Sequence, residues 1–210
     1  MSRMKAIILG STGLVGGHLL RLLLESESFR EVVAFNRRSL GIEHAKLKEE
    51  IVDFDQIQNL DVSADFMFCC LGTTIKKAGS KEAFRKVDLE IPLSFARNFS
   101  KTKHQGFVVI SAIGANKSSP FFYNKVKGEL EYELKNASLK KLAIVRPSLL
   151  LGDRTETRLG EDIGQFLSPL LKFVLPARYS PIKARHVACA MIDLALKGKT
   201  DQSLEYEVTP

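Results

Sequence analysis

Short apolar runs of strand length alternate along the chain with longer segments of helical periodicity. Runs that are apolar at nearly every position are typical of parallel strands whose two faces are both covered. Segments with apolar residues three and four positions apart are typical of amphipathic helices. The pattern predicts strands at 4–10, 31–36, 49–53, 65–71, 106–111, 142–146 and 204–208. It predicts helical segments at 14–26, 55–61, 80–100, 121–137, 161–173 and 184–197.

This alternation predicts an α/β fold with a doubly wound parallel sheet. No internal repeat, long linker or low-complexity segment interrupts the sequence. We therefore expect a single domain over 1–210, in which residues of about 148–183 form a small substrate-side portion. Ser80 is a suitable N-cap for the helix that follows it. Pro92 lies inside that helical segment, and we expect a kink or a division there.

The first strand leads into a glycine-rich turn that opens the first helix. Glycine suits a tight turn, close approach of the backbone to phosphate, and close packing of helix on strand. A helix N-terminus placed there attracts the pyrophosphate of a dinucleotide, as in a Rossmann fold. The predicted contacts are Gly10, Ser11, Thr12, Gly13, Leu14, Val15 and Gly16, with hydroxyl donors at Ser11 and Thr12. The alternative is a packing turn that holds no ligand.

The segment after the second strand indicates which dinucleotide is preferred. An acidic residue there accepts from the ribose of NAD, whereas arginine accommodates the 2′-phosphate of NADP. The chain has Asn36, Arg37 and Arg38 at this point, and a guanidinium pairs well with phosphate. The sequence predicts NADP(H) as the preferred cofactor, with NAD(H) as the alternative. Arg37 directly follows the strand and is the stronger candidate, although a solvated basic loop would look the same.

Two further strand ends are candidate cofactor contacts. Asp53 and Phe54 follow the third strand, where a carboxylate can meet the adenine amino group and a ring its face. Asp53 is equally suited to capping the next turn. The turn after the fourth strand has small residues that let the backbone approach the second ribose. It comprises Leu71, Gly72, Thr73 and Thr74.

The candidate catalytic residues follow the fifth strand. Ser111 ends that strand, Tyr123 comes twelve residues later, and Lys127 lies one helical turn further on the same face. A lysine cation near a phenol lowers its pKa, so the tyrosine can exchange a proton with a carbonyl oxygen during hydride transfer. Tyr123 and Lys127 are also candidate cofactor contacts, the lysine through a ribose hydroxyl, and the serine would orient the substrate oxygen. Lys125 should point elsewhere on the helix.

Composition narrows the class of protein. The net charge is +7, but the lysines are scattered, so we expect no nucleic-acid partner. The three cysteines lack the spacing of metal ligands, which predicts core thiols in a reducing compartment and no metal site. The sequence has neither eighteen consecutive apolar residues nor a signal-peptide pattern, so we expect no membrane span and a cytoplasmic location.

Together these motifs resemble the atypical short-chain dehydrogenases/reductases, and within them the Tat-interacting protein-like oxidoreductases. The matching segments span most of the chain: 10–16, 36–38, 70–74, 109–115, 123–128 and 146–152. The resemblance implies a Rossmann fold binding NADP(H), with Ser111, Tyr123 and Lys127 in the catalytic positions. It also implies that Pro147 and Ser148 lie beside the nicotinamide. The asparagine that many such enzymes carry on the preceding helix has no clear counterpart, and nearby Asp88 is assigned no role.

The sequence therefore predicts an NADP(H)-dependent oxidoreductase that acts on a small carbonyl or alcohol. One alternative is a non-catalytic NADP(H)-binding redox sensor or regulatory interaction protein, which would have no need of the Ser–Tyr–Lys set. Another is a nucleotide-sugar epimerase or dehydratase, against which the short region after the 142–146 strand argues. Pairing of two copies through the helices that flank the 106–111 strand, as in many relatives, stays open.

Overall fold

The computed structural model describes residues 3–151, 180–197 and 204–208. Within these ranges seven parallel strands form one sheet, in the order β3-β2-β1-β4-β5-β6-β9. The strands are β1 (Met4–Leu9), β2 (Phe29–Asn36), β3 (Leu47–Ile51), β4 (Phe66–Cys69), β5 (Gly106–Ile110), β6 (Leu142–Pro147) and β9 (Leu204–Val208). The strand order changes direction between β1 and β4, and ligands of such sheets bind at the carboxyl ends of the strands there. The predicted doubly wound α/β fold is confirmed.

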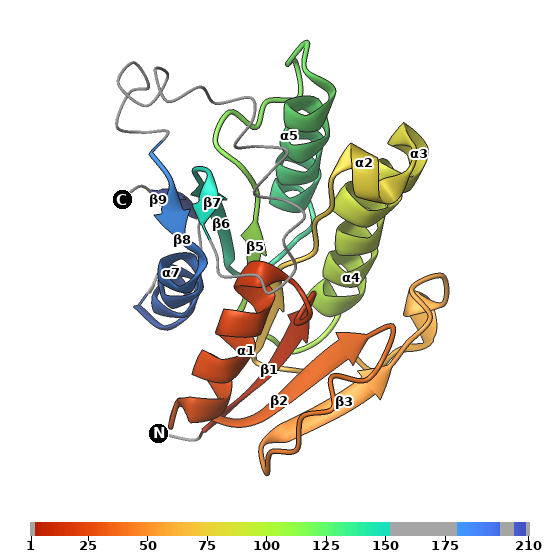
Figure 1. Cartoon of the computed structure of the whole chain (residues 1–210). Helices are drawn as coiled ribbons and strands as arrows, with labels where there is room; N and C mark the ends of the chain where they lie inside the picture. The colour runs from red at the N-terminus through yellow and green to blue at the C-terminus, as the bar shows by residue number, and fades with distance from the viewer. Residues whose placement is uncertain (1–2, 152–179, 198–203, 209–210) are drawn as a thin grey trace.

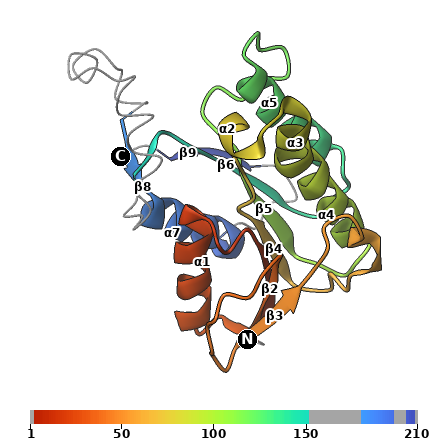
Figure 2. The same ribbon diagram turned by 45° about the vertical axis from the view of Figure 1, so that its right-hand side comes forward.

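Helices cover both faces of the sheet. Helices α1 (Leu14–Glu25) and α7 (Ala184–Lys197) lie on one face, and α4 (Ile91–Ser100) and α5 (Phe122–Lys135) lie on the other (Figure 1). The second view shows the same two layers (Figure 2). Along β1, Ala6 and Ile8 pack with α1 and α7, whereas Ile7 and Leu9 pack with α4 and α5. Burial on both faces explains why the strands are apolar at nearly every position.

The predicted helix at 80–100 is divided, as expected, but the division precedes the proline. Ser80 caps α3 (Lys81–Arg85) by accepting from the amide of Ala83, and a π-helical segment, η2 (Lys86–Glu90), joins α3 to α4. Pro92 has no N–H to donate to the carbonyl of Asp88, four residues earlier. The regular hydrogen-bond ladder is therefore interrupted one turn before the proline, and a π-helical turn fills that place.

Some elements were not predicted because they are too short for periodicity to detect. They are α2 (Ile75–Ala78), β7 (Leu150–Leu151) and β8 (Ile182–Lys183), and η1 (Ile57–Asn59) is a single 3₁₀ turn within the helical segment expected at 55–61. The third strand begins and ends two residues earlier than predicted, and β6 includes Pro147 rather than ending before it. The helix predicted at 161–173 and most of the 148–183 portion lie outside the described residues.

An ion-pair cluster fixes the carboxyl end of β6. Arg146 bonds Glu131 of α5 through two nitrogens, at 2.9 and 2.5 Å, and its third nitrogen lies 2.7 Å from Glu205 of β9. Glu131 is buried. Paired guanidinium–carboxylate contacts are directional, so the cluster holds α5 and β9 against β6 immediately before Pro147.

No helix among the described residues has both the length and the apolar character needed to cross a membrane.

Candidate functional site

The glycine turn between β1 and α1 depends on residues without side chains. Gly10 has a φ of +81°, which favours glycine, and its carbonyl accepts from the amide of Gly13 at 2.9 Å. A Cβ on Gly16 would overlap the carbonyl of Gly10. The first turn of α1 contains no acidic residue, and Gly13 supplies no side-chain cap. The backbone amides of this first turn of α1 are therefore suited to bind an anion such as a pyrophosphate.

The turn is tied to the second strand through Ser11. Its hydroxyl donates to the Asn36 side-chain oxygen at 2.5 Å, and both residues are buried. The Asn36 amide in turn donates to Glu49 of β3 at 3.1 Å. The Ser11 proton therefore points toward β2, whereas the predicted phosphate contact would direct it out of the turn. Thr12 is exposed.

The loop after β2 carries two exposed arginines. In the part of the chain that the structure describes, no hydrogen bond or ion pair engages the side chain of Arg37 or Arg38. Both guanidinium groups are therefore available to an anionic ligand. They follow Asn36, so they lie on the same edge of the sheet as the glycine turn.

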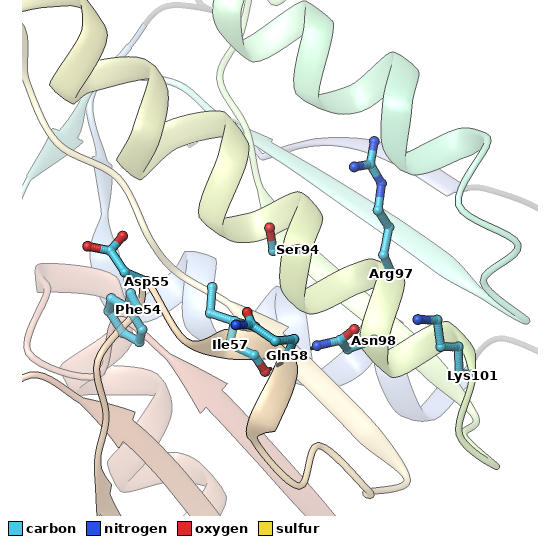
Figure 3. Close-up of a pocket in the computed structure, with 8 residues that line it drawn as sticks. All are labelled: Phe54, Asp55, Ile57, Gln58, Ser94, Arg97, Asn98 and Lys101. Atoms are coloured by element: carbon cyan, nitrogen blue, oxygen red, sulfur yellow. Dashed lines mark hydrogen bonds between the residues drawn. The ribbon is translucent and has the colours of Figure 1, made fainter.

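Asp53 and Phe54 make protein contacts. The Asp53 carboxylate accepts from the amide of Asp55 at 2.9 Å, which is the capping role that the sequence left open. The Phe54 ring packs edge-on against Phe95 of α4, with 5.8 Å between ring centres. It also lines a cavity of about 270 Å³ between η1 and α4 (Figure 3). No predicted catalytic residue lines that cavity, so it is separate from the strand-end site.

The predicted catalytic serine and tyrosine lie at the ends of neighbouring elements. Ser111 directly follows β5 and is buried, and its hydroxyl has no hydrogen-bond partner among the described residues. Tyr123 lies in the first turn of α5, is 39% exposed, and has its ring 5.8 Å from that of Phe84. A buried hydroxyl without a protein partner is uncommon, and a bound ligand or an ordered water would supply that partner.

Lys127 has a partner that sequence reasoning missed. Its Nζ lies 2.7 Å from Oδ1 of Asp88, and both side chains are buried. Asp88 Oδ2 accepts from the amide of Thr73 at 2.8 Å. No local signal marked Asp88, because charged Lys86 and Glu90 stand two positions away on either side and its partner lies far away in sequence. The expected separation of the two lysines holds, since Lys125 is exposed and Lys127 is not.

The ion pair keeps Lys127 charged. Burial alone lowers the pKa of this lysine, but the charge of Asp88, the electrostatic interaction with Tyr123 and the hydrogen bond that the ammonium donates to Asp88 together outweigh burial. The net result is a pKa above the ordinary lysine value. The ammonium is therefore positive at neutral pH, and its charge acts on both Asp88 and Tyr123.

Two predicted segments remain: the turn at 71–74, and Pro147 with Ser148. The turn lies close to this ion pair, and Pro147 contacts the loop after Ser111. A Cβ on Gly72 would lie 3.5 Å from Asp88 Oδ1 and 3.8 Å from Lys127 Nζ. Thr74 caps α2 by accepting from the amide of Lys77, and Leu71 packs against the core. The carbonyl of Pro147 accepts from Ile113 in the loop after Ser111. The hydroxyl of Ser148 donates to the carbonyl of Ser180 at 2.6 Å.

The core-thiol prediction holds for Cys69, which is buried, and for Cys70, which packs against the core, whereas Cys189 is half-buried and belongs to neither core cluster. Cys69 and Cys70 pack on opposite faces of the sheet, and Cys189 is free. Burial raises the pKa of the Cys69 thiol to about 11 and that of Cys70 well above the ordinary value. Neither thiol is therefore ionised at neutral pH, so neither is an activated nucleophile. Within the described ranges, no group of three His, Cys, Asp or Glu residues could hold a metal ion.

Comparison with known proteins agrees with this arrangement. Residues 27–201 match the model of the family described as HIM1. The mitochondrial protein FMP52 of Candida albicans is 34% identical over 204 residues, which cover 93% of this chain and 89% of that protein. Protein HTATIP2 of Rattus norvegicus is 36% identical over 167 residues, covering 77% and 69%. The resemblance to Tat-interacting protein-like oxidoreductases is confirmed.

Solved structures show the same fold. A short-chain dehydrogenase family protein of Francisella tularensis has a TM-score of 0.74 at 15% identity, over 98% of each chain. The enzyme WbmH of Bordetella bronchiseptica, in complex with NAD⁺, has a TM-score of 0.73 at 17% identity, over 99% of this chain and 76% of WbmH. At 15% and 17% identity, these likenesses show the fold alone.

One sequence-based expectation is wrong. The sequence analysis predicted a cytoplasmic location, but FMP52 proteins of several yeasts are named as mitochondrial. The expectation rested on the lack of a signal-peptide pattern and of a long apolar run. Neither feature distinguishes the cytoplasm from the mitochondrion.

Substitution of Gly16 should disrupt the turn. We expect Gly16→Ala to lower the midpoint of thermal unfolding, because the new methyl group would overlap the carbonyl of Gly10. Gly17→Ala is the matched control, since its Cβ would meet its nearest neighbour at 3.5 Å. Alanine in a helix is favoured over glycine by about 0.5–1 kcal/mol, so this control should unfold at an equal or higher temperature. Equal midpoints for the two variants would contradict the packing argument.

Removal of the Asp88 charge should destabilise the protein. We expect Asp88→Asn to lower the free energy of unfolding by about 3 kcal/mol, because Lys127 stays buried without its counter-charge. The loss should shrink at alkaline pH, where the lysine becomes neutral. Asp55→Asn is the control: it breaks an exposed ion pair with Lys86, which solvent screens, so it should change stability much less. Urea denaturation measures both, and a similar loss in the two variants would refute this account.

Proposed function

Because the chain belongs to the HIM1 family, whose model matches most of its length, we propose that it is an NADP(H)-dependent oxidoreductase acting on a small carbonyl or alcohol. The observation that carries the proposal is the buried Ser111 hydroxyl, which lacks a partner among the described residues at the end of β5. A substrate oxygen held there would supply that partner. The charged Lys127 and the half-exposed Tyr123 lie on the helix that follows.

The donor groups of the chain suit a dinucleotide phosphate. The uncapped first turn of α1 has free amides and no carboxylate, so it fits a pyrophosphate. Arg37 and Arg38, without protein partners in the described ranges, would hold the 2′-phosphate of NADP(H). The turn at 71–74 would lie along the second ribose, and Pro147 and Ser148 beside the nicotinamide. An adenine contact for Asp53 and Phe54 is a weaker part of the proposal, because both side chains already have protein contacts.

Each catalytic candidate has a distinct task in this scheme. The bound nicotinamide supplies or accepts the hydride. In the reducing direction Tyr123 gives its phenolic proton to the substrate oxygen, and in the reverse direction it takes that proton back. Ser111 donates a hydrogen bond to the same oxygen and stabilises its charge. Lys127 holds a ribose hydroxyl and stabilises the phenolate, while Asp88 fixes the position of the ammonium.

The rival functions have less support. A redox sensor that binds NADP(H) without catalysis would not need a buried serine hydroxyl, a tyrosine and a charged lysine at one strand end. The likeness to a UDP-N-acetylglucosamine 4-epimerase of Methanobrevibacter ruminantium is only 16% in sequence and concerns the fold alone. We further propose that the protein works in mitochondria, because its FMP52 relatives are named as mitochondrial proteins.

Calorimetric titration with NADPH and NADH tests the cofactor assignment. We expect NADPH to bind more tightly than NADH. The double substitution Arg37→Ala and Arg38→Ala should weaken NADPH binding by about tenfold or more, since hydrogen bonds to charged groups contribute roughly 1.5–3 kcal/mol. NADH affinity should stay within about twofold. Arg30→Ala, at the opposite end of β2, is the control and should leave both affinities unchanged. Undiminished NADPH affinity in the double variant would contradict NADP selection, and binding of neither dinucleotide would contradict the proposed function.

Replacement of the tyrosine tests the catalytic step. We expect Tyr123→Phe to lower turnover by about a hundredfold or more, because general acid catalysis contributes that much, without changing NADPH affinity. Oxidation of NADPH is followed by absorbance against a panel of small aldehydes and ketones. Tyr132→Phe removes an exposed phenol from the same helix and should keep full activity. Full turnover by Tyr123→Phe on any substrate would remove the tyrosine from the mechanism.

A further inference from the structure

The carboxylate of Glu49 is the centre of a hydrogen-bond network beside the arginine loop. Oε1 accepts from the Leu40 amide at 2.6 Å and from the Asn36 side-chain amide at 3.1 Å. Oε2 accepts from the Ser39 hydroxyl at 2.7 Å. Each oxygen of the carboxylate is therefore engaged by donors from the loop or from the end of β2.

The network encloses both arginines of the loop. Asn36 lies immediately before Arg37, and Ser39 immediately follows Arg38, so Glu49 holds the chain on both sides of the pair. The side chains of the two arginines have no partner of their own within the described residues. The position of their backbone is thus fixed by Glu49 rather than by any contact of the guanidinium groups.

The same network continues into the glycine turn. Asn36, which donates to Glu49, accepts from the Ser11 hydroxyl at 2.5 Å, and both side chains are buried. A continuous path of hydrogen bonds therefore joins the loop after β2, the third strand and the start of α1. The loop is held in register with the helix N-terminus that is proposed to bind the pyrophosphate.

We propose that Glu49 is a positioning residue that sets the preference for NADP(H) over NAD(H), by holding Arg37 and Arg38 where they reach the 2′-phosphate. This inference rests on the proposed function. Glu49 itself does not touch the cofactor, since its oxygens are occupied by the loop. By charge alone, a carboxylate near a phosphate would weaken NADPH binding, so its effect through geometry and its effect through charge have opposite signs.

Two substitutions of Glu49 separate these effects. Glu49→Gln removes the charge but keeps the shape: its oxygen can accept from Leu40 and Asn36, and its amide can donate to the Ser39 hydroxyl. Glu49→Ala removes the whole network. Glu50→Gln is the matched control, because it removes a carboxylate from the same strand that is paired only with Lys48 among the contacts described.

The measurement is the calorimetric affinity of the full chain for NADPH, NADH, 2′,5′-ADP and 5′-AMP. We expect Glu49→Ala to weaken NADPH and 2′,5′-ADP by about tenfold while NADH and 5′-AMP stay within about twofold. Glu49→Gln should bind NADPH as tightly as the unaltered protein or more tightly, and Glu50→Gln should match the unaltered protein. In a chain that already lacks both arginines, Glu49→Ala should change NADPH affinity by less than about twofold, because it acts through them.

Three results would overturn the inference. An equal loss of affinity for all four ligands in Glu49→Ala would make Glu49 a general support of the fold. The expected result, in which NADH affinity is retained, excludes simple misfolding. NADPH binding that is tighter in Glu49→Ala than in the unaltered protein would assign the effect of Glu49 to its charge. A full effect of Glu49→Ala without the arginines would break the proposed link. Failure of the unaltered protein to bind any dinucleotide would instead reject the proposed function itself.

Discussion

A lysine ammonium buried beside a single carboxylate is the interaction on which the strand-end site depends. The Lys127–Asp88 pair joins three segments that are distant in sequence: helix α5, the π-helical turn η2 and the loop after β4. Neither charge could be buried without the other, because desolvation of an unpaired charge costs several kcal/mol. The pair therefore fixes the spacing between α5 and the loop at 71–74, and with it the place of Tyr123.

The two ends of the site follow one design. At one end, Asp88 accepts from a loop amide and faces a lysine. At the other, Glu49 accepts from a loop amide and holds the segment that carries two arginines. In both places a carboxylate supports a loop at the carboxyl edge of the sheet and lies near cationic residues, Lys127 in one place and Arg37 with Arg38 in the other. Because loops lack the repeating hydrogen bonds of strands and helices, such side-chain acceptors supply the missing partners.

The fold could be predicted from the sequence because its signals are local. Apolar runs, helical spacing and the glycine turn each lie within one element, and the terminal strand at 204–208 was predicted with the same limits as observed. The contacts that organise the site are between distant residues. Asp88 meets Lys127, and Ser11 meets Asn36, only after the sheet has formed. Sequence spacing could therefore identify the catalytic candidates but gave no sign of their supporting partners, and it could not decide whether Asp53 caps a turn or meets a ligand.

The pairing of β7 with β8 places residues 150 and 182 side by side. The two ends of the intervening segment therefore meet at nearly one point, next to the Ser148 hydroxyl that bonds Ser180. The entropic cost of closing such a loop rises only slowly with its length. Insertions and deletions between the two strands can thus accumulate without disturbing the sheet or the glycine turn.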